Sequence, residues 1–116
     1  TCARLSLQYY GGGLYVADGG LANLDGCNVY SNEAQYDGGG IWIWGTATLT
    51  NTDVYENVAY GNSGSGGGLF VWGTATLTNT NVYTNQATDG YGAGLFVQGT
   101  ANLNGCNIFD NQAESG

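Results

Sequence analysis

The chemistry open to this 116-residue sequence depends mainly on aromatic rings and hydroxyls, because it has only nine acids, one basic residue and no histidine. Hydrolysis of a glycosidic bond requires carboxylates placed in pairs across it, and a lyase requires a base beside clustered acids. The only base, Arg4, lies near the start of the sequence. The acids are scattered over positions that do not align with one another: Asp18, Asp25, Glu33, Asp37, Asp53, Glu56, Asp89, Asp110 and Glu114. We therefore expect no catalytic residues, no cofactor and no enzymatic activity.

Metal binding is not indicated by the pattern of acids either. The sequence lacks the GGxGxDxUx calcium-roll repeat and the twelve-residue loop of an EF-hand. Asp37 and Asp89 stand beside glycine-rich corners, where we expect them to be solvated loop acids. The sequence predicts no metal site.

The net charge of −8 restricts the partners that this protein can bind. Without a basic surface it cannot neutralise phosphates, so binding to nucleic acid is not expected. Anionic membranes would repel it, and no apolar stretch approaches the roughly 20 residues of a membrane span. Because there is no initiating Met and no basic-then-apolar leader, we expect a processed or excised piece.

The elements that must position the aromatic rings come from an internal repeat. Residues 41–52 read IWIWGTATLTNT, and residues 69–80 read LFVWGTATLTNT. Glycine triplets begin at positions 11, 38 and 66, with a GAG variant at 92, so the repeat is 26 to 28 residues long. The apolar positions of the repeat align as Leu14, Ile41, Leu69 and Leu95; Val16, Ile43, Val71 and Val97; Leu24, Leu49, Leu77 and Leu103; and Val29, Val54, Val82 and Ile108.

Alternation with a period of two places these columns on one face of successive strands. A unit this short cannot bury an apolar face alone, whereas stacked units bury all four columns as one interior. The sequence therefore predicts a single all-β domain over residues 1–116, a parallel β-helix with rungs about 4.8 Å apart. Its parts are a partial coil (1–10) and the coils 11–37, 38–65, 66–91 and 92–116.

Two further columns predict the corners of the coils. Gly26, Asn51, Asn79 and Gly105 are residue types that tolerate the left-handed backbone conformation. Asn32, Asn57, Asn85 and Asn111 predict a ladder of side-chain amides bonded from coil to coil. Aligning TCARLS (1–6) with GCNVYS (26–31) makes residues 1–10 a piece of one more coil, with Cys2 over Cys27.

The repeat resembles the right-handed parallel β-helix repeats of bacterial polymorphic outer-membrane proteins and related surface proteins. Their GGA motif followed by an aliphatic residue is matched, with Gly for Ala, by 39–41 and 67–69. Their FxxN motif is matched, with an aliphatic residue for Phe, by 54–57, 82–85 and 108–111. The resemblance implies a right-handed parallel β-helix. It does not imply one function, because β-helices serve as adhesins, passengers, fibres and pectin-lyase-like enzymes.

The three cysteines share one column. Cys2 and Cys27 on neighbouring rungs lie within the Cα distance that a disulfide allows. Cys106 is three rungs from Cys27, so we expect it to be free or to form an intermolecular bond. Alternatively, all three are small buried hydrophobic residues, where the middle coils carry threonine.

Threonines face outward if Ala47 and Leu49 face inward. These hydroxyls are candidates for O-linked sugars, although β-propensity and hydroxyl ladders also explain them. The candidates are Thr46, Thr48, Thr50, Thr74, Thr76 and Thr78.

The same parity predicts an outward aromatic face consisting of Tyr15, Trp42, Trp44, Phe70, Trp72 and Phe96, and a second row of Tyr30, Tyr55, Tyr83 and Phe109. Stacking along the solenoid accounts for part of this pattern, but so contiguous an apolar patch is rarely left to water. We expect a non-enzymatic, extracellular building block of a filament or surface appendage, self-associating head to tail and laterally. The alternative is a carbohydrate-binding or adhesin module in which Trp42, Trp44 and Trp72 form the platform for a glycan.

Overall fold

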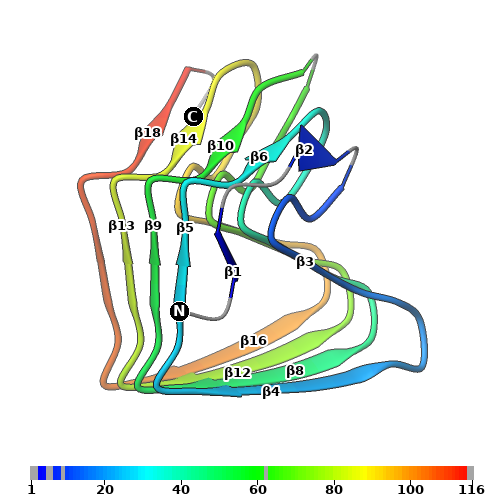
Figure 1. The fold of residues 1–116 in the computed structure, drawn as a ribbon, viewed down its shortest axis with the longest axis vertical. Coiled ribbons are helices and arrows are strands. Elements are labelled where there is room, and N and C mark those ends of the chain that lie inside the picture. The colour runs from blue at the N-terminus through cyan, green and yellow to red at the C-terminus, as the bar shows by residue number, and fades with distance from the viewer. Residues whose placement is uncertain (1–2, 5–6, 9, 62, 115–116) are drawn as a thin grey trace.

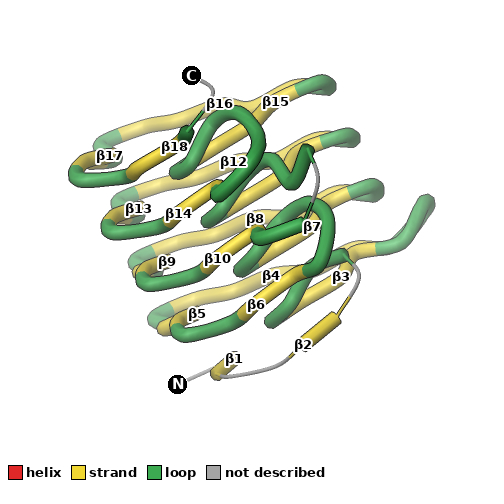
Figure 2. The backbone as a smooth tube through the Cα atoms, turned by 90° about the horizontal axis from the view of Figure 1, so that it is seen from above, coloured by secondary structure: helices red, strands yellow, loops and turns green. Residues whose placement is uncertain are grey.

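The computed structural model describes residues 3–4, 7–8, 10–61 and 63–114. The chain forms a parallel β-solenoid of about four turns (Figure 1). Successive coils are stacked in chain order from one end of the molecule to the other (Figure 2). The predicted all-β solenoid is confirmed. The described residues include no helix, and hence none long and apolar enough to cross a membrane.

Each complete coil contains four strands, and the preceding part of the chain adds β1 (Ala3–Arg4) and β2 (Leu7–Gln8). The first coil has β3 (Leu14–Val16), β4 (Leu21–Asp25), β5 (Asn28–Tyr30) and β6 (Glu33–Ala34). The second has β7 (Ile41–Ile43), β8 (Thr46–Thr50), β9 (Asp53–Tyr55) and β10 (Val58–Ala59). The third has β11 (Leu69–Val71), β12 (Thr74–Thr78), β13 (Asn81–Tyr83) and β14 (Gln86–Ala87). The fourth has β15 (Leu95–Val97), β16 (Thr100–Asn104), β17 (Asn107–Phe109) and β18 (Gln112–Ala113).

Equivalent strands pair in parallel, giving the sheet orders β1-β5-β9-β13-β17, β18-β14-β10-β6-β2, β15-β11-β7-β3 and β16-β12-β8-β4. The register follows the repeat, so that Leu77 lies between Leu49 and Leu103. The aligned aliphatic residues of the inner coils have no exposed surface and form one continuous core with Ala47 and Ala75. The predicted interior columns are therefore confirmed.

The short fourth strand of each coil was not identified from the sequence. Its inward residue is alanine, and Ala34, Ala59 and Ala87 are completely buried. The sequence feature that could have indicated this strand is the alanine that follows each ladder asparagine by two residues. A two-residue strand with one small apolar side chain is too short to show a period of two.

The partial coil pairs one residue away from the predicted alignment. Ala3 lies opposite Val29 and Arg4 opposite Tyr30, whereas the sequence alignment places Arg4 in the column of Val29. That column is buried, and an unpaired charge in it would be unfavourable, which explains the shift. Cys2 lies outside the described residues, so its pairing with Cys27 stays a prediction.

The corner predicted after the second strand is confirmed. Gly26, Asn51, Asn79 and Gly105 have φ values of 65°, 48°, 48° and 64°. A second left-handed corner precedes each ladder asparagine, at Ser31, Glu56, Thr84 and Asp110, with φ values of 53° to 56°. The asparagine column predicted a corner here, but it did not reveal the positive φ of the preceding residue, because Ser, Glu and Thr do not favour that conformation.

The asparagine ladder is also confirmed, and it holds the second corner. Asn32 Nδ2 donates to Asn57 Oδ1 at 3.1 Å, and Asn57 and Asn85 each donate to the next Oδ1 at 3.0 Å. The same amides bond to backbone groups; Asn57 Nδ2, for example, donates to Val29 O. The ladder thus replaces the backbone pairing that the corner interrupts.

Candidate functional site

The aromatic face lies outside the sheet formed by β3, β7, β11 and β15. Trp42 stacks between Tyr15, at a centroid distance of 4.9 Å, and Phe70, at 5.9 Å. Phe70 continues the stack to Phe96 at 5.0 Å. In-register parallel strands hold the same side chain on each rung, so the rings form a ladder along the solenoid.

Two rings of this face are buried, which corrects the expectation that all of them are exposed. Trp42 is 6% exposed and Phe70 is 4% exposed, although both lie outside the core. Rings of the neighbouring coils cover their faces, and Trp44 packs nearly perpendicular to Trp42, with ring centroids 5.7 Å apart. The surface that remains comes mainly from Tyr15, Trp44 and Trp72, each close to half exposed. Phe96 is half-buried.

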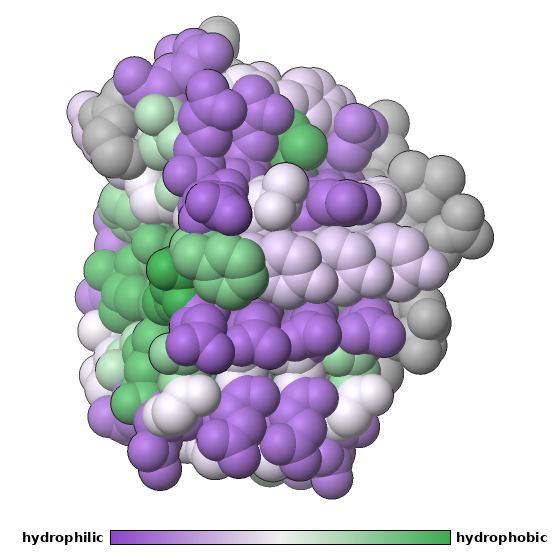
Figure 3. All heavy atoms as spheres, turned by 90° about the vertical axis from the view of Figure 1, so that its left-hand side faces the viewer, coloured by the Kyte–Doolittle hydropathy of each residue, from purple (hydrophilic) through white to green (hydrophobic). Residues whose placement is uncertain are grey.

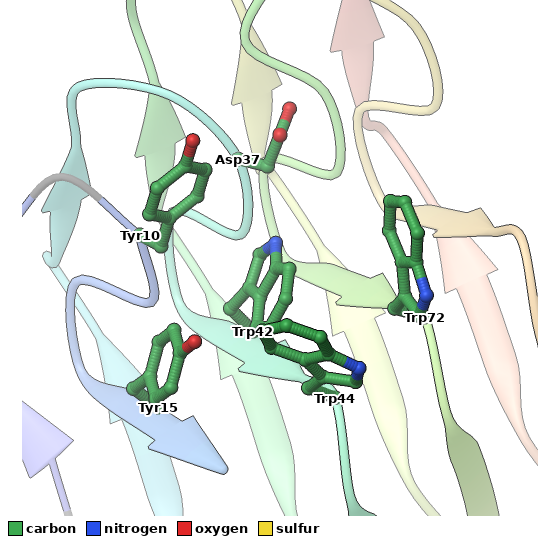
Figure 4. Close-up of a pocket in the computed structure, with 6 residues that line it drawn as sticks. All are labelled: Tyr10, Tyr15, Asp37, Trp42, Trp44 and Trp72. Atoms are coloured by element: carbon green, nitrogen blue, oxygen red, sulfur yellow. The ribbon is translucent and has the colours of Figure 1, made fainter. Parts of the chain in front are cut away.

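A hollow of about 270 Å³ opens on this face (Figure 4). Its lining consists of Tyr10, Tyr15, Asp37, Trp42, Trp44 and Trp72. We call it the aromatic pocket. The structure thus brings together all three tryptophans that were predicted as a platform.

Tyr10 and Asp37 were not identified from the sequence as members of this site. Each precedes the first glycine of a triplet, and Gly11 N donates to Asp37 O, which places the two residues on successive rungs of the same corner. That corner lies beside the aromatic strands because Gly38 turns the chain there with φ +67°. A side chain on Gly38 would come within 2.9 Å of Trp42 Cβ. The position before each triplet was the signal that could have found them.

Asp37 is partly buried, contrary to the expectation of a solvated loop acid. Burial raises the pKa of its carboxyl above the ordinary value of 3.8, and the backbone N–H of Ser65, donating at 2.8 Å, partly offsets this. The indole nitrogen of Trp42 is buried and has no hydrogen-bond partner among the described residues. In Figure 4 it lies on the ring edge that faces Asp37. The pocket therefore combines an acceptor with an unpaired donor.

Replacing Asp37 by asparagine should stabilise the protein at neutral pH. The raised pKa means that the folded protein holds this proton more tightly than the unfolded chain does. Ionised Asp37 therefore lowers stability at pH 7, and this cost disappears as the pH falls through the folded pKa toward 3.8. Asparagine keeps an oxygen for the Ser65 N–H.

Melting temperatures of Asp37→Asn and wild type should differ at pH 7 and converge near pH 4. Asp89→Asn, which removes the same charge from an exposed loop position, is the control. Equal pH dependence of the two variants would contradict an effect of burial at Asp37.

The second aromatic row also forms a ladder, and it crosses the middle of Figure 3. Tyr30, Tyr55, Tyr83 and Phe109 stack at 5.0 to 5.1 Å with their planes within 5° of parallel. Desolvation in the stack is the main cause that raises the pKa of Tyr55 and of Tyr83, with smaller contributions from nearby acids such as Asp53. Because its rings stack on one another along the solenoid, we assign this row a structural role.

The remaining predicted site residues lie apart from the aromatic pocket. The threonines proposed for O-glycosylation lie on β8 and β12 and have some exposed surface, which leaves that modification a prediction. Cys27 is buried and disulfide-bonded, and Cys106 is a free cysteine at the last coil. Within the described ranges, no three His, Cys, Asp or Glu side chains gather in a way that could hold a metal ion.

The last coil forms a second candidate site, because its interior columns are open. Leu103 is 42% exposed and Ile108 is 45% exposed, whereas their equivalents Leu77 and Val82 are completely buried. Hydrophobic surface gathers at the left of Figure 3, at one end of the second aromatic row. Among the described strands, β15, β16, β17 and β18 each lie at the edge of their sheet. This end, which we call the open end, combines apolar surface with unpaired strand edges.

Comparison with models of protein families, with curated proteins and with solved structures found no match.

Proposed function

We propose that this protein is a non-enzymatic building block of an extracellular filament or surface appendage, in which copies stack head to tail. The observation that carries this proposal is the open end, where side chains equivalent to the core are left in water. Exposed, flat strand edges with apolar neighbours readily pair with another chain. The repeat resembles those of surface β-helices, and we propose that this chain belongs with them. This resemblance supports a location outside the cell.

A second copy suits the open end because the opposite end offers the same four sheets in the same order. There β1 and β2 are edge strands of two sheets, and β3 and β4 are edge strands of the other two, one rung further in. Leu21, at the start of β4, is 81% exposed. Joining opposite ends does not close into a ring, so it produces a filament.

At the N-terminal end two sheets end one rung earlier than the other two, and this difference determines the distance at which subunits repeat along the filament. We expect subunits to recur every four to five rungs, roughly 19–24 Å at about 4.8 Å per rung. Because every copy carries a charge of −8, we expect assembly to strengthen as salt screens the repulsion. Continued stacking also brings Cys106 to the junction, where an intermolecular disulfide is our prediction.

Ile108→Asp should abolish assembly while leaving the monomer folded. Ile108 belongs to a column that is buried in the other coils, yet it is nearly half exposed at the open end. A charge at this position therefore remains hydrated until a second copy covers it. Asn107→Asp, whose side chain lies on the outer face of the same strand, is the matched control. Sedimentation and electron microscopy report assembly, and circular dichroism reports folding.

Two results would contradict the proposal. One is a wild-type protein that stays monomeric at high concentration and high salt. The other is Ile108→Asp assembling as well as Asn107→Asp does. Lateral association through the aromatic face is tested separately with Trp44→Ser combined with Trp72→Ser, since Trp42 is already buried within one chain.

The second candidate function is carbohydrate binding through the aromatic face. It is favoured by the aromatic pocket, which places a carboxylate and an unpaired indole N–H beside exposed rings. Aromatic platforms for sugars require such polar neighbours to fix orientation. This function does not exclude the first, because a filament can carry binding sites along its side.

A further inference from the structure

We infer that the aromatic pocket binds one unit of a neutral saccharide, and that a hydroxyl of this unit bridges Trp42 and Asp37. This inference rests on the second candidate function and specifies its ligand. It is independent of the open end, which lies in another part of the molecule.

Trp42 supplies a donor that the protein itself leaves unused. Both faces of its ring are taken, by Tyr15 and Phe70, so only its edge is available to a ligand. On that edge Nε1 is buried without a hydrogen-bond partner in the described chain. A buried N–H without a partner is unfavourable, and a ligand oxygen placed against it would remove the penalty.

Asp37 supplies the matching acceptor. Its Oδ1 accepts from Ser65 N, whereas its other oxygen makes no hydrogen bond within the described residues. A ligand atom between an N–H and a carboxylate must accept from the first and donate to the second. A hydroxyl does both, and a saccharide presents several hydroxyls around an apolar ring.

Trp44 and Trp72 supply the stacking surface. Both rings are about half exposed, and their centroids are 6.4 Å apart with the planes inclined at 54°. Inclined rings form the side and floor of a hollow in Figure 4 rather than a flat platform. With a volume of about 270 Å³ it is at the small end of ligand sites, so it suits a single sugar unit at a chain end or branch.

Charge and geometry exclude the other ligands that an aromatic pocket attracts. Acidic sugars would be repelled by Asp37 and by the net charge of −8. A quaternary ammonium ion can stack on Trp44 and Trp72, but it has no N–H or O–H to donate to Asp37. Such an ion also offers no acceptor to Nε1. A neutral saccharide satisfies both polar groups.

Access to Nε1 requires one side chain to move. The atom is covered in the empty pocket. Tyr10, whose ring centroid is 5.6 Å from that of Trp42, is 42% exposed and therefore has room to move. We expect Tyr10 to rotate when the sugar enters.

The test uses an immobilised panel of neutral oligosaccharides built from glucose, galactose, mannose and xylose, followed by calorimetric titration of the best-retained one. Trp42→Phe removes only the N–H end of the ring and keeps the stack, and Asp37→Asn removes only the charge. Each should weaken binding by roughly tenfold, the loss of one charge-assisted or buried hydrogen bond. Trp72→Ala should abolish retention, and Tyr60→Ala, an exposed ring outside the pocket, should not change it.

The outcomes separate the inference from the function on which it rests. If no neutral oligosaccharide is retained, carbohydrate binding itself is wrong. If binding is lost in Trp72→Ala but unchanged in Trp42→Phe and Asp37→Asn, the protein binds sugars without the bridging hydroxyl. Retention of polygalacturonate or choline in place of the neutral panel would overturn the assigned ligand class. Circular dichroism of each variant verifies that it is folded.

Discussion

Replacing Leu77 by aspartate is expected to prevent folding at neutral pH. Leu77 is completely buried between Leu49 and Leu103, in a core that is only one coil wide. An unpaired carboxylate there costs several kcal/mol, which is comparable to the roughly 5–15 kcal/mol stability of a whole domain. The coil cannot move aside, since each of its strands is paired on both sides. Circular dichroism and hydrogen exchange would measure the loss.

Thr76→Asp is the matched control, on the same strand with the opposite orientation. Thr76 is half-buried on the outer side of β12 and lies beside Thr48 and Asn102. Its aspartate variant should fold, with a melting temperature a few degrees from that of the wild type. If Leu77→Asp melted normally and Thr76→Asp did not fold, the two faces of the strand would be assigned the wrong way round.

Replacing Asn57 by leucine is expected to cost several kcal/mol despite the similar size of the side chains. Asn57 Oδ1 accepts from Asn32 N and Nδ2, each at 3.1 Å, and its Nδ2 donates to Val29 O and to Asn85 Oδ1. Leucine removes all of these bonds inside a region with no exposed surface. Each buried polar group left without a partner costs about 1–3 kcal/mol. Denaturant titration would measure the change.

Asn111→Leu provides the comparison for the ladder. Asn111 makes the equivalent bonds to Asn85 and to Val82 O, but it lies at the end of the ladder and is only half-buried. Water can replace part of what is lost there, so the free energy of unfolding should fall less than in Asn57→Leu. Equal losses at the two positions would mean that burial does not determine how much the ladder hydrogen bonds contribute to the free energy of unfolding.

The repeat made the architecture predictable, because columns such as Leu24, Leu49, Leu77 and Leu103 recur once in every unit and allow one register. The sequence also identified Asn51 and Asn79 as corner residues, since their type matches the conformation. It did not identify Thr84 and its equivalents, where a β-branched residue adopts φ +55°. There the conformation is imposed by the neighbouring amide ladder and not by local preference.

The tryptophans of the site were predictable from the sequence, but the shape of the pocket and its members Tyr10 and Asp37 were not. Strand parity places Trp42, Trp44 and Trp72 on one side of the sheet, but it does not show how far one ring covers the next. Burial of Trp42 follows from ring size and from the distance between rungs, which are properties of the assembled ladder. Asp37 joins the pocket through a corner, and side chains at a corner have no period from which a direction can be inferred.

The uniform register between coils has a consequence for how such a chain can vary in length. Removal of residues 46–73 would join Gly45 to Thr74, which occupies the position of Thr46 one rung away. Every ladder would then close again between the remaining coils, with aliphatic residues still meeting aliphatic residues. Duplication of the same segment would add a coil with equal ease. The protein can therefore be lengthened or shortened in whole turns by gain or loss of one unit. A deletion of a few residues within a strand would instead misalign the strands of all four sheets.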